Sequence, residues 1–323
     1  MTNAEPLHFH ALVYLWWNEP SHLGDEWVLG MQPRRHGRRP SRTGFDPATA
    51  ERMGLVLDFM PFGNRRDPHK HHRKEPVVQV IGFRRFTLLD GIPLNFTDID
   101  FLEKVSLLSE MLKSVIRLSG TRRSLVTNVI LSCYKERDHM SCFPVTPIDE
   151  EDYGLLLESF EEPERERVRI LREFGEMEDL LESRGLPRKA IRVPPTPLSY
   201  DDLTPTAKEN LPRAIEAIVR SRESEFVEFF NIAEPINVRL HAIELLPGIG
   251  KKTLRKVLQY RNSKRFESFD EVHKVAKVDP VQALVSKILE EIKGEASYYL
   301  FVRPREPNRP FLDYLTLIAR SRR

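Results

Sequence analysis

The chain has 323 residues, of which 40% are hydrophobic, and this is enough for two or three domains with a sizeable core. The formal net charge of +2 is the sum of opposed blocks, because residues 251–265 hold seven Lys/Arg and no acid, whereas the acidic block at 149–184 holds fourteen Asp/Glu and five Arg. Two cysteines do not indicate a disulfide framework, and no run of about 20 apolar residues predicts a membrane span. With no recognisable secretory signal, we expect a cytoplasmic protein.

Residues 1–52 differ from the rest of the chain, because an apolar stretch at 8–17 is followed by a basic, turn-rich run at 34–40. We expect a flexible N-terminal extension over residues 1–52, or a translation start at Met53. The basic run fits a solvated tail, and it also fits contact with RNA. Both interpretations stay open at this point.

Residues 53–110 carry the pattern of a small β-barrel. Apolar runs predict a strand over Leu55–Met60, one or two strands over 76–89 with a break at Gly82, and another strand within 92–108. Short strands separated by turns suggest a small β-barrel, which closes on itself and leaves no exposed sheet edge; barrels of the oligonucleotide-binding (OB) type are one class of such barrels.

Residues 111–197 are predicted to form an acidic, largely helical insertion that ends in a Pro-rich linker at 194–197. A helical period at its start spans 103–118, a strand is predicted for 124–133, and a further helical pattern covers 164–184. The spacing of the acids fits a solvated helix face. It also fits a surface that contacts a basic protein partner, such as a translation or ribosome-associated protein.

Residues 198–302 are predicted to form an all-α domain, followed by a basic tail at 303–323. Thr204 is suited to cap a helix that has Pro205 at its first position. The further predicted elements are helices over 225–230, over 235–246, directly after 250 and over 281–293, with a strand over 298–302. Three aromatic residues have a helical spacing that favours burial in the core over stacking on bases: Phe226, Phe229 and Phe230.

A glycine hairpin in this domain joins an apolar stretch to a basic helical pattern, in the segment Leu246-Pro247-Gly248-Ile249-Gly250-Lys251-Lys252. Two glycines permit a tight turn, and the first backbone N–H groups of the following helix have no partners within that helix. These groups and the helix dipole suit a phosphate oxygen, with Ile249 pointing inward. A purely structural turn is the alternative. The residues expected to bind nucleic acid here are Gly248, Ile249, Gly250, Lys251, Lys252, Arg255 and Lys256.

A second basic segment lies between the first two predicted strands, and either phosphate contact or simple solvation explains its charge. Its candidate binding residues are Arg65, Arg66, Lys70, Arg73 and Lys74, and it also carries His69, His71 and His72.

Metal binding and catalysis find little support in the sequence. The spacing of Cys133, His139 and Cys142 and the clustered histidines of the basic loop lack a matching second ligand pair, so no metal site is predicted. The chain has no nucleotide-binding glycine loop and no zinc-protease helix, and His241 has no nucleophile or paired carboxylate near it in the sequence. We therefore expect no enzyme activity and no cofactor, apart from a monovalent cation bound at the hairpin, where the amides hold phosphate.

Several long motifs occur in order within residues 198–302: Tyr200-Asp201-Asp202-Leu203-Thr204, Phe226-Val227-x-Phe229-Phe230-Asn231, Arg239-Leu240-His241-x-x-Glu244-Leu245-Leu246-Pro247-Gly248-Ile249-Gly250-Lys251-Lys252, Phe266-Glu267-Ser268-Phe269 and Tyr298-Tyr299-Leu300-Phe301-Val302. Together they closely resemble an archaeal family, domain of unknown function 655, described as predicted RNA- or nucleotide-binding proteins. Residues 53–89 match it more loosely. The resemblance implies an OB-like barrel followed by a helix-hairpin-helix domain. The acidic insertion, and the lack of a second glycine hairpin at 275–280, depart from the family pattern.

We therefore expect an α+β multidomain protein with a small N-terminal OB-like β-barrel, a helical insertion and an all-α helix-hairpin-helix domain. The favoured function is non-enzymatic binding of nucleic acid, through contacts to its phosphate backbone. RNA is favoured over DNA because the resemblance implies it, and no membrane contact is expected. Two alternatives stay open: a DNA-repair or nuclease accessory that binds duplex DNA, and an interaction protein that docks a basic partner on its acidic insertion.

Overall fold

The computed structural model describes residues 51–119, 122–136, 138–194 and 196–322. The basic run at 34–40 and nearly all of the expected N-terminal extension lie outside these described residues.

Glu51 already belongs to the fold. Its side chain is buried, and its carboxylate accepts backbone N–H groups from Arg84 at 2.8 Å, Arg85 at 2.6 Å and Thr87 at 3.4 Å. Buried carboxylates need such partners, because an unpaired one is costly away from water. The folded part of the chain therefore starts before Met53, and a chain that began at Met53 would lack these bonds.

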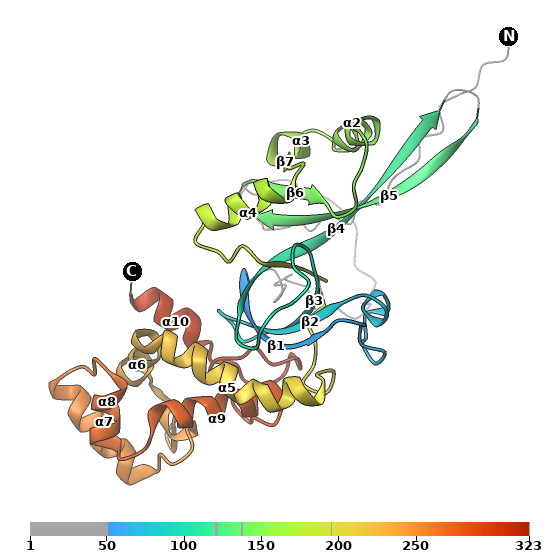
Figure 1. The fold of residues 1–323 in the computed structure, drawn as a ribbon. Coiled ribbons are helices and arrows are strands. Elements are labelled where there is room, and N and C mark those ends of the chain that lie inside the picture. Colours follow the sequence, from blue (N-terminus) through green and yellow to red (C-terminus); the bar gives the residue numbers. More distant parts are fainter. Residues whose placement is uncertain (1–50, 120–121, 137, 195, 323) are drawn as a thin grey trace, which may run out of the picture. The chain divides into compact units, whose positions relative to one another are not determined.

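Five strands of the large sheet form a closed ring of pairings (Figure 1). They are β1 Met53–Met60, β2 Val77–Gly82, β3 Leu88–Pro93, β4 Lys104–Ser119 and β8 Ala190–Val193. Antiparallel pairing runs from β1 to β2, from β2 to β3 and from β3 to β8, and β8 then lies parallel to β4. The ring returns to its start because β4 also pairs antiparallel with β1. One strand of this ring, β8, lies within the predicted insertion at 111–197 and follows the acidic block at 149–184 in the sequence.

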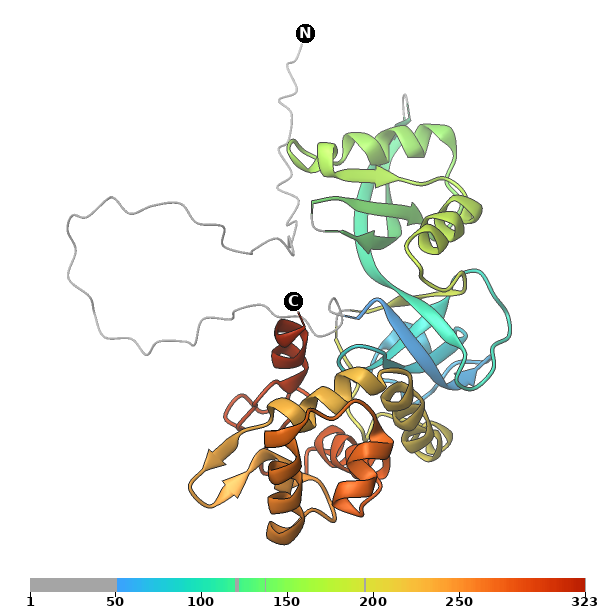
Figure 2. The same ribbon diagram turned by 90° about the vertical axis from the view of Figure 1, so that its left-hand side faces the viewer.

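The sheet continues from β4 into three further strands: Figure 2 shows β4 running up out of the ring, and Figure 1 shows the long hairpin that it forms with β5. These strands are β5 Arg122–Lys135, β6 Met140–Pro144 and β7 Val168–Ile170. Cys133 of β5 and Cys142 of β6 face each other in antiparallel register and form a disulfide, with Cα atoms 4.1 Å apart. The cysteine count did not indicate this disulfide, which forms because strand register places the two residues within bonding reach.

The acidic block forms three short helices beside this part of the sheet. They are α2 Glu150–Glu158, α3 Glu164–Arg167 and α4 Phe174–Ser183. The helical pattern over 164–184 is therefore confirmed only in part, because β7 interrupts it.

The rest of the chain is mainly helical. Its elements are α5 Pro205–Ser221, α6 Glu223–Ile232, β9 Pro235–Asn237, β10 Leu240–His241, the 3-10 turn η2 Ala242–Leu245, α7 Lys251–Ser263, α8 Phe269–Ala276, α9 Pro280–Lys293 and α10 Tyr314–Ser321. The start of α5 is as predicted: the hydroxyl of Thr204 accepts the N–H of Ala207 at 3.0 Å, with Pro205 at the first position. No helix in the described ranges is long and apolar enough to cross a membrane.

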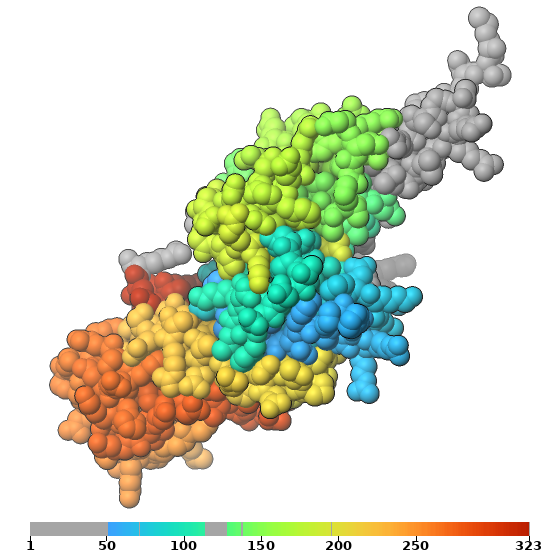
Figure 3. All heavy atoms as spheres, viewed as in Figure 1, coloured from blue at the N-terminus to red at the C-terminus, as the bar shows by residue number. Residues whose placement is uncertain are grey.

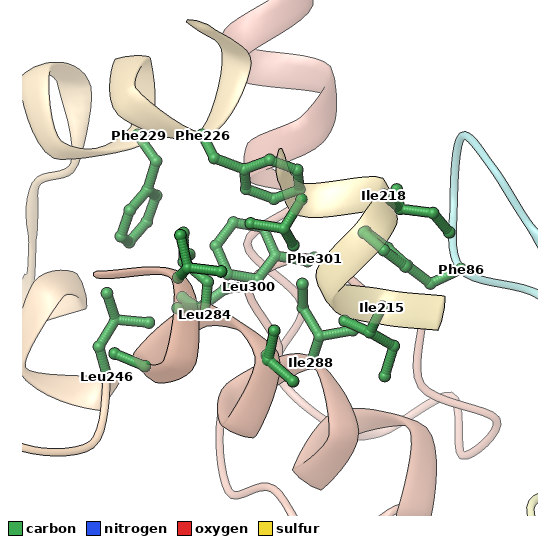
Figure 4. Packing of buried hydrophobic residues seen from close by; sticks show 14 of the residues in the cluster. Phe86, Ile215, Ile218, Phe226, Phe229, Leu246, Leu284, Ile288, Leu300 and Phe301 are labelled. Carbon is green, nitrogen blue, oxygen red and sulfur yellow. The ribbon is translucent and has the colours of Figure 1, made fainter. Parts of the chain in front are cut away.

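One hydrophobic core joins these helices to the ring of strands. Figure 4 shows Phe86 of the strand region beside Ile215 and Ile218 of α5, and the rings of Phe226 and Phe301 near them. The core prediction for Phe226, Phe229 and Phe230 is confirmed, since all three side chains are fully buried.

Polar contacts strengthen the same junction. The side-chain amide of Asn210 in α5 donates to the carbonyl of Leu57 in β1 at 2.8 Å. The buried side chain of Gln79 in β2 accepts the N–H of Thr204 at 2.9 Å. The confirmed part of the predicted architecture is therefore the α+β class, and the packing of the first helix of the C-terminal half on the sheet is a finding of the structure.

The helix predicted over 103–118 is wrong, because this segment is β4. Its apolar spacing matched a helical period, but Leu112 is 58% exposed, whereas Val105 and Leu107 point into the core of the ring. Leu108 points into a second core with Phe143 and Met177. The strand passes between two cores, so its apolar residues do not need to share one face. The spacing of apolar residues in such a segment does not distinguish a helix from a strand.

Two elements of the helical half also differ from expectation. Residues 235–246 do not form a helix, because β9 and β10 pair with each other and η2 follows. Residues 298–302 form only an isolated bridge between Tyr299 and Phe311. Their backbone N–H groups are used elsewhere: the buried carboxylate of Glu291 accepts those of Leu300 at 2.7 Å, Phe301 at 2.9 Å and Val302 at 2.8 Å.

Candidate nucleic-acid interface

The glycine hairpin connects η2 to α7, and His241 fixes the turn that leads into it. The Nδ1 atom of His241 accepts the N–H of Ile243 at 3.2 Å, and the carboxylate of Glu244 accepts the N–H of His241 at 2.9 Å. Burial lowers the pKa of His241, so the ring stays neutral and Nδ1 stays an acceptor. His241 is 5% exposed, so it is a packed rather than a solvent-facing histidine.

The two hairpin glycines have different surroundings. Gly248 has a φ of +84°, and a Cβ added there would lie 3.2 Å from a methyl group of Val278, so this position requires glycine. Gly250 has an extended backbone with φ of −95°, and a Cβ added there would meet no atom within 4 Å. Between them, Ile249 points inward as predicted and is 5% exposed. The turn is therefore anchored on one side and open at Gly250.

Gly250 is also the N-cap residue of α7, and it offers no side chain to the first-turn N–H groups. The first turn of α7 contains no acidic residue. The neighbouring helix α9 differs, because the carboxylate of Asp279 accepts the N–H groups of Val281 at 2.9 Å and Gln282 at 3.2 Å. The positive end of the α7 dipole therefore faces open space without a carboxylate of its own, and this suits an external anion.

The basic residues of α7 separate into two groups. Lys251 donates to the carboxylate of Glu244 at 2.8 Å and to the carbonyl of Arg239, so its charge is already paired. Three others are exposed, and within the described part of the chain none of them forms an ion pair: Lys252, Arg255 and Lys256. Their spacing of three and four residues places them along one side of the helix, from its first turn upward.

The remaining basic residues of the segment 251–265 form hydrogen bonds or ion pairs within the protein. Arg261 donates to the carbonyl of Ala233 at 2.7 Å. Lys264 pairs with Glu271 at 2.9 Å, and Arg265 pairs with Glu228 at 2.5 Å. The basic composition of residues 251–265 therefore overstates the free charge, which is concentrated near the hairpin.

A second turn, within residues 275–280 where the sequence lacks a second glycine hairpin, packs against the first. It joins α8 to α9, and its Lys277 adopts a left-handed conformation with φ of 57°. Val278 of this turn is the residue that contacts Gly248. Lys274 and Lys277 are exposed and add positive charge near the hairpin. The signal for this turn was the Asp279-Pro280 pair, which is typical of a helix start.

The basic loop between β1 and β2 is the other candidate surface, and Figure 3 shows this segment in light blue. It contains the 3-10 turn η1 Lys70–Arg73. All five candidate cations are exposed: Arg65, Arg66, Lys70, Arg73 and Lys74. Phe62, a residue that the sequence reasoning missed, is 90% exposed and lines a surface hollow with Arg65, Arg73 and Lys74. Its signal was an aromatic residue between Pro61 and Gly63, inside a basic loop.

The two metal groupings considered from the sequence have different outcomes. Cys133 and Cys142 are joined in a disulfide, so they are not thiolate ligands together with His139. His69 and His72 of the basic loop lie against two buried carboxylates, which come from Asp67 and Asp90.

The family model described as Protein of unknown function (DUF655) matches residues 50–303. The chain belongs to this family. The uncharacterized protein MJ0038 of Methanocaldococcus jannaschii is 40% identical over 108 residues, which are 33% of this chain and 50% of that protein. The crystal structure of the DUF655 protein Af1531 from Archaeoglobus fulgidus is 28% identical, with a TM-score of 0.47, and the match covers 78% of this chain and 100% of that one. The family resemblance inferred from the sequence motifs is therefore confirmed, and the chain spans about half the length of its M. jannaschii relative.

Proposed function

We propose that this DUF655 protein binds nucleic acid without catalysis, by holding the phosphate backbone at the glycine hairpin. The observation that carries the proposal is the start of α7, where the first-turn N–H groups have no side-chain cap and the turn itself contains no acidic residue. A phosphate oxygen is a suitable acceptor for such groups. Lys252, Arg255 and Lys256 follow directly along the helix and supply positive charge without partners of their own in the described residues.

The contacts would position a strand without reading its sequence. Backbone N–H groups and lysines address phosphate oxygens, which are the same at every nucleotide. Gly250 is well placed for close approach, because no atom occupies the space where a side chain would stand. The hairpin carbonyls can also hold a monovalent cation, which would bridge to the phosphate.

We also infer that the ring of five paired strands is the OB-like barrel that the family resemblance implies. The basic loop between β1 and β2 then corresponds to a loop that such barrels use for single strands. An exposed aromatic ring beside Arg65, Arg73 and Lys74 matches this use, because bases stack on aromatic side chains while cations hold the backbone. Phe62 is the stacking residue in this account, and single-stranded RNA is the favoured ligand.

The acidic insertion gives weaker support to a protein partner. Several of its carboxylates are already engaged, since Arg188 pairs with Glu178 at 2.8 Å and with Glu182 at 2.5 Å. Arg172 likewise pairs with Glu150 at 2.8 Å. These contacts lower the charge that is left for docking a basic protein, so this function stays the second alternative.

Fluorescence anisotropy with three labelled ligands tests the proposal: a single-stranded RNA, a structured RNA and a duplex DNA of equal length. We expect the RNA ligands to bind more tightly, with affinity that falls steeply as salt rises. Tighter binding to the duplex DNA would favour the DNA-repair or nuclease accessory. The absence of binding to all three ligands at low salt would refute the proposal.

A further inference from the structure

A compact group of four side chains lies where the basic loop meets the sheet. Asp67, His69 and His72 come from the loop, and Asp90 comes from β3. One ligand atom from each residue lies within 4.8 Å of every other. The Nδ1 atom of His69 is 3.0 Å from Asp90 Oδ2 and 3.4 Å from Asp67 Oδ1. The Nδ1 atom of His72 is 3.6 Å from Asp67 Oδ1 and in hydrogen-bonding contact with Asp90 Oδ2.

Local turns bring the three loop residues to one point. The N–H of Asp67 donates to the carbonyl of Asn64 at 2.9 Å, and the N–H of His69 donates to Asp67 Oδ1 at 2.9 Å. The turn η1 then returns the chain, so that the N–H of His72 donates to the carbonyl of His69 at 3.0 Å. The loop residues Asp67, His69 and His72 are spaced by two and three residues in the sequence, and this spacing gives no sign of Asp90. The antiparallel pairing of β2 with β3 brings Asp90 to the same point.

Both carboxylates are fully buried, with 0% of Asp67 and of Asp90 exposed. Within the described residues, no hydrogen-bond donor reaches Asp67 Oδ2 or Asp90 Oδ1. Two buried carboxylates so close together need positive charge between them, because unpaired charge away from water is strongly unfavourable. Either protons on the two imidazoles or a metal cation supplies this charge.

We propose that Asp67, His69, His72 and Asp90 form a binding site for a divalent transition-metal ion of the zinc class. Two imidazole nitrogens and two carboxylate oxygens are a four-ligand set that zinc accepts in tetrahedral sites. Ligand bonds of about 2.0–2.2 Å imply ligand atoms about 3.3–3.6 Å apart. The distances of 3.4 and 3.6 Å agree with this spacing, whereas the 3.0 Å contact of His69 with Asp90 and the closer contact of His72 with Asp90 have to open.

The two imidazole nitrogens in this ligand set make calcium and magnesium unfavourable ions for the site. Calcium and magnesium select oxygen ligands in larger numbers, whereas imidazole nitrogen suits zinc, copper, nickel and iron. A second carboxylate balances the charge of a divalent ion. The structure therefore points to one class of ion by its chemistry, without selecting a single element within that class.

The site would tie the basic loop to the sheet. Three ligands lie within six consecutive residues of the loop, and the fourth lies on β3. Arg73 follows the last loop ligand and donates from Nε to the carbonyl of Asp67 at 3.0 Å, so its position depends on the same turn. The proposed metal ion therefore has a structural role, and the proposal does not depend on whether the loop binds nucleic acid.

Titration of the metal-stripped full chain with Co²⁺ and Zn²⁺ tests the site. We expect one equivalent of Co²⁺ to give the visible spectrum of a four-coordinate ion, and Zn²⁺ to displace it. At a free Zn²⁺ concentration about 100 times Kd, the melting temperature should rise by about 5–10 °C. Asp90→Asn and His69→Gln should each abolish the Co²⁺ spectrum. His273→Gln, at an exposed histidine in the helical half, is the matched control and should bind as the wild type does.

His69→Gln keeps the test decisive if Asp90→Asn fails to fold, because His69 is the least buried of the four. A wild-type chain that binds no Co²⁺ and gains no thermal stability from Zn²⁺ would show a buried His–Asp ion-pair cluster only. Binding that survives in a folded His69→Gln variant would also overturn the proposal.

Discussion

The substitution Gly250→Ala tests the hairpin with little disturbance of the fold. The backbone of Gly250, with φ of −95° and ψ of −178°, is open to any residue, and an added Cβ would meet no atom within 4 Å. An N-cap side chain lies beside the first-turn N–H groups, so the new methyl group would stand where a phosphate oxygen must approach. We expect a loss of folding stability of about 1 kcal/mol or less, from the poorer capping preference of Ala.

The expected effect on binding is larger than the effect on stability. Loss of one hydrogen bond to a charged phosphate corresponds to about 1.5–3 kcal/mol, which raises Kd by roughly 10- to 100-fold. Anisotropy with a labelled single-stranded RNA measures Kd, and urea denaturation measures stability on the same samples. Gly175→Ala in α4 is the matched control, because a Cβ there also meets no atom within 4 Å. A folded Gly250→Ala variant with the Kd of the control would refute the reasoning.

Three further substitutions test other parts of the account. Phe62→Ala should leave the melting temperature unchanged, because the ring is 90% exposed, but should weaken single-strand binding by about 1–3 kcal/mol if a base stacks there. Unchanged affinity, as expected for the exposed control Val238→Ala, would remove the stacking role. Glu291→Gln should lower the free energy of unfolding by about 1–3 kcal/mol at pH 8, where a carboxyl with a pKa raised to about 7 by burial is ionised and accepts three backbone N–H groups; equal urea midpoints would contradict this role. His241→Asn should flatten the acid dependence of stability: since burial lowers the folded pKa of His241, the unfolded state takes up the proton first, and wild-type stability falls as pH drops below about 6.5. Parallel stability curves for the two proteins would contradict that assignment.

Local sequence signals predicted the elements whose causes are local. Thr204 and Pro205 fix the start of α5, and the paired glycines with Ile249 fix the hairpin before α7, so both follow from a few adjacent residues. Pro235 was misleading for the helix predicted over 235–246, because proline is accepted at the first position of a helix and also at the start of an exposed strand. The segment 298–302 lacks its predicted strand because a carboxylate on α9 takes up its N–H groups, and this partner lies about ten residues away.

The sequence predicted which residues belong to the candidate site, but not the contacts that depend on the folding of other segments. The sequence supplied the hairpin glycines and the basic residues of α7, but not the pairing of Lys251 with Glu244, which depends on how η2 is folded. Composition likewise counted Arg261 as free charge, although its side chain points to backbone carbonyls. The cluster around His69 needed a residue from β3, and no spacing rule links Asp90 to a loop about twenty residues earlier.

The dependence of affinity on salt tests most directly whether α7 holds a phosphate backbone. The wild type and a variant with Lys252, Arg255 and Lys256 all changed to Ala are titrated with a single-stranded RNA at several salt concentrations. Each phosphate contact to a single strand contributes about 0.7 to the slope of log K against log salt, so loss of three contacts should reduce that slope by about 2. Equal slopes for the two folded proteins would contradict the account, because the charges on α7 would then take no part in binding.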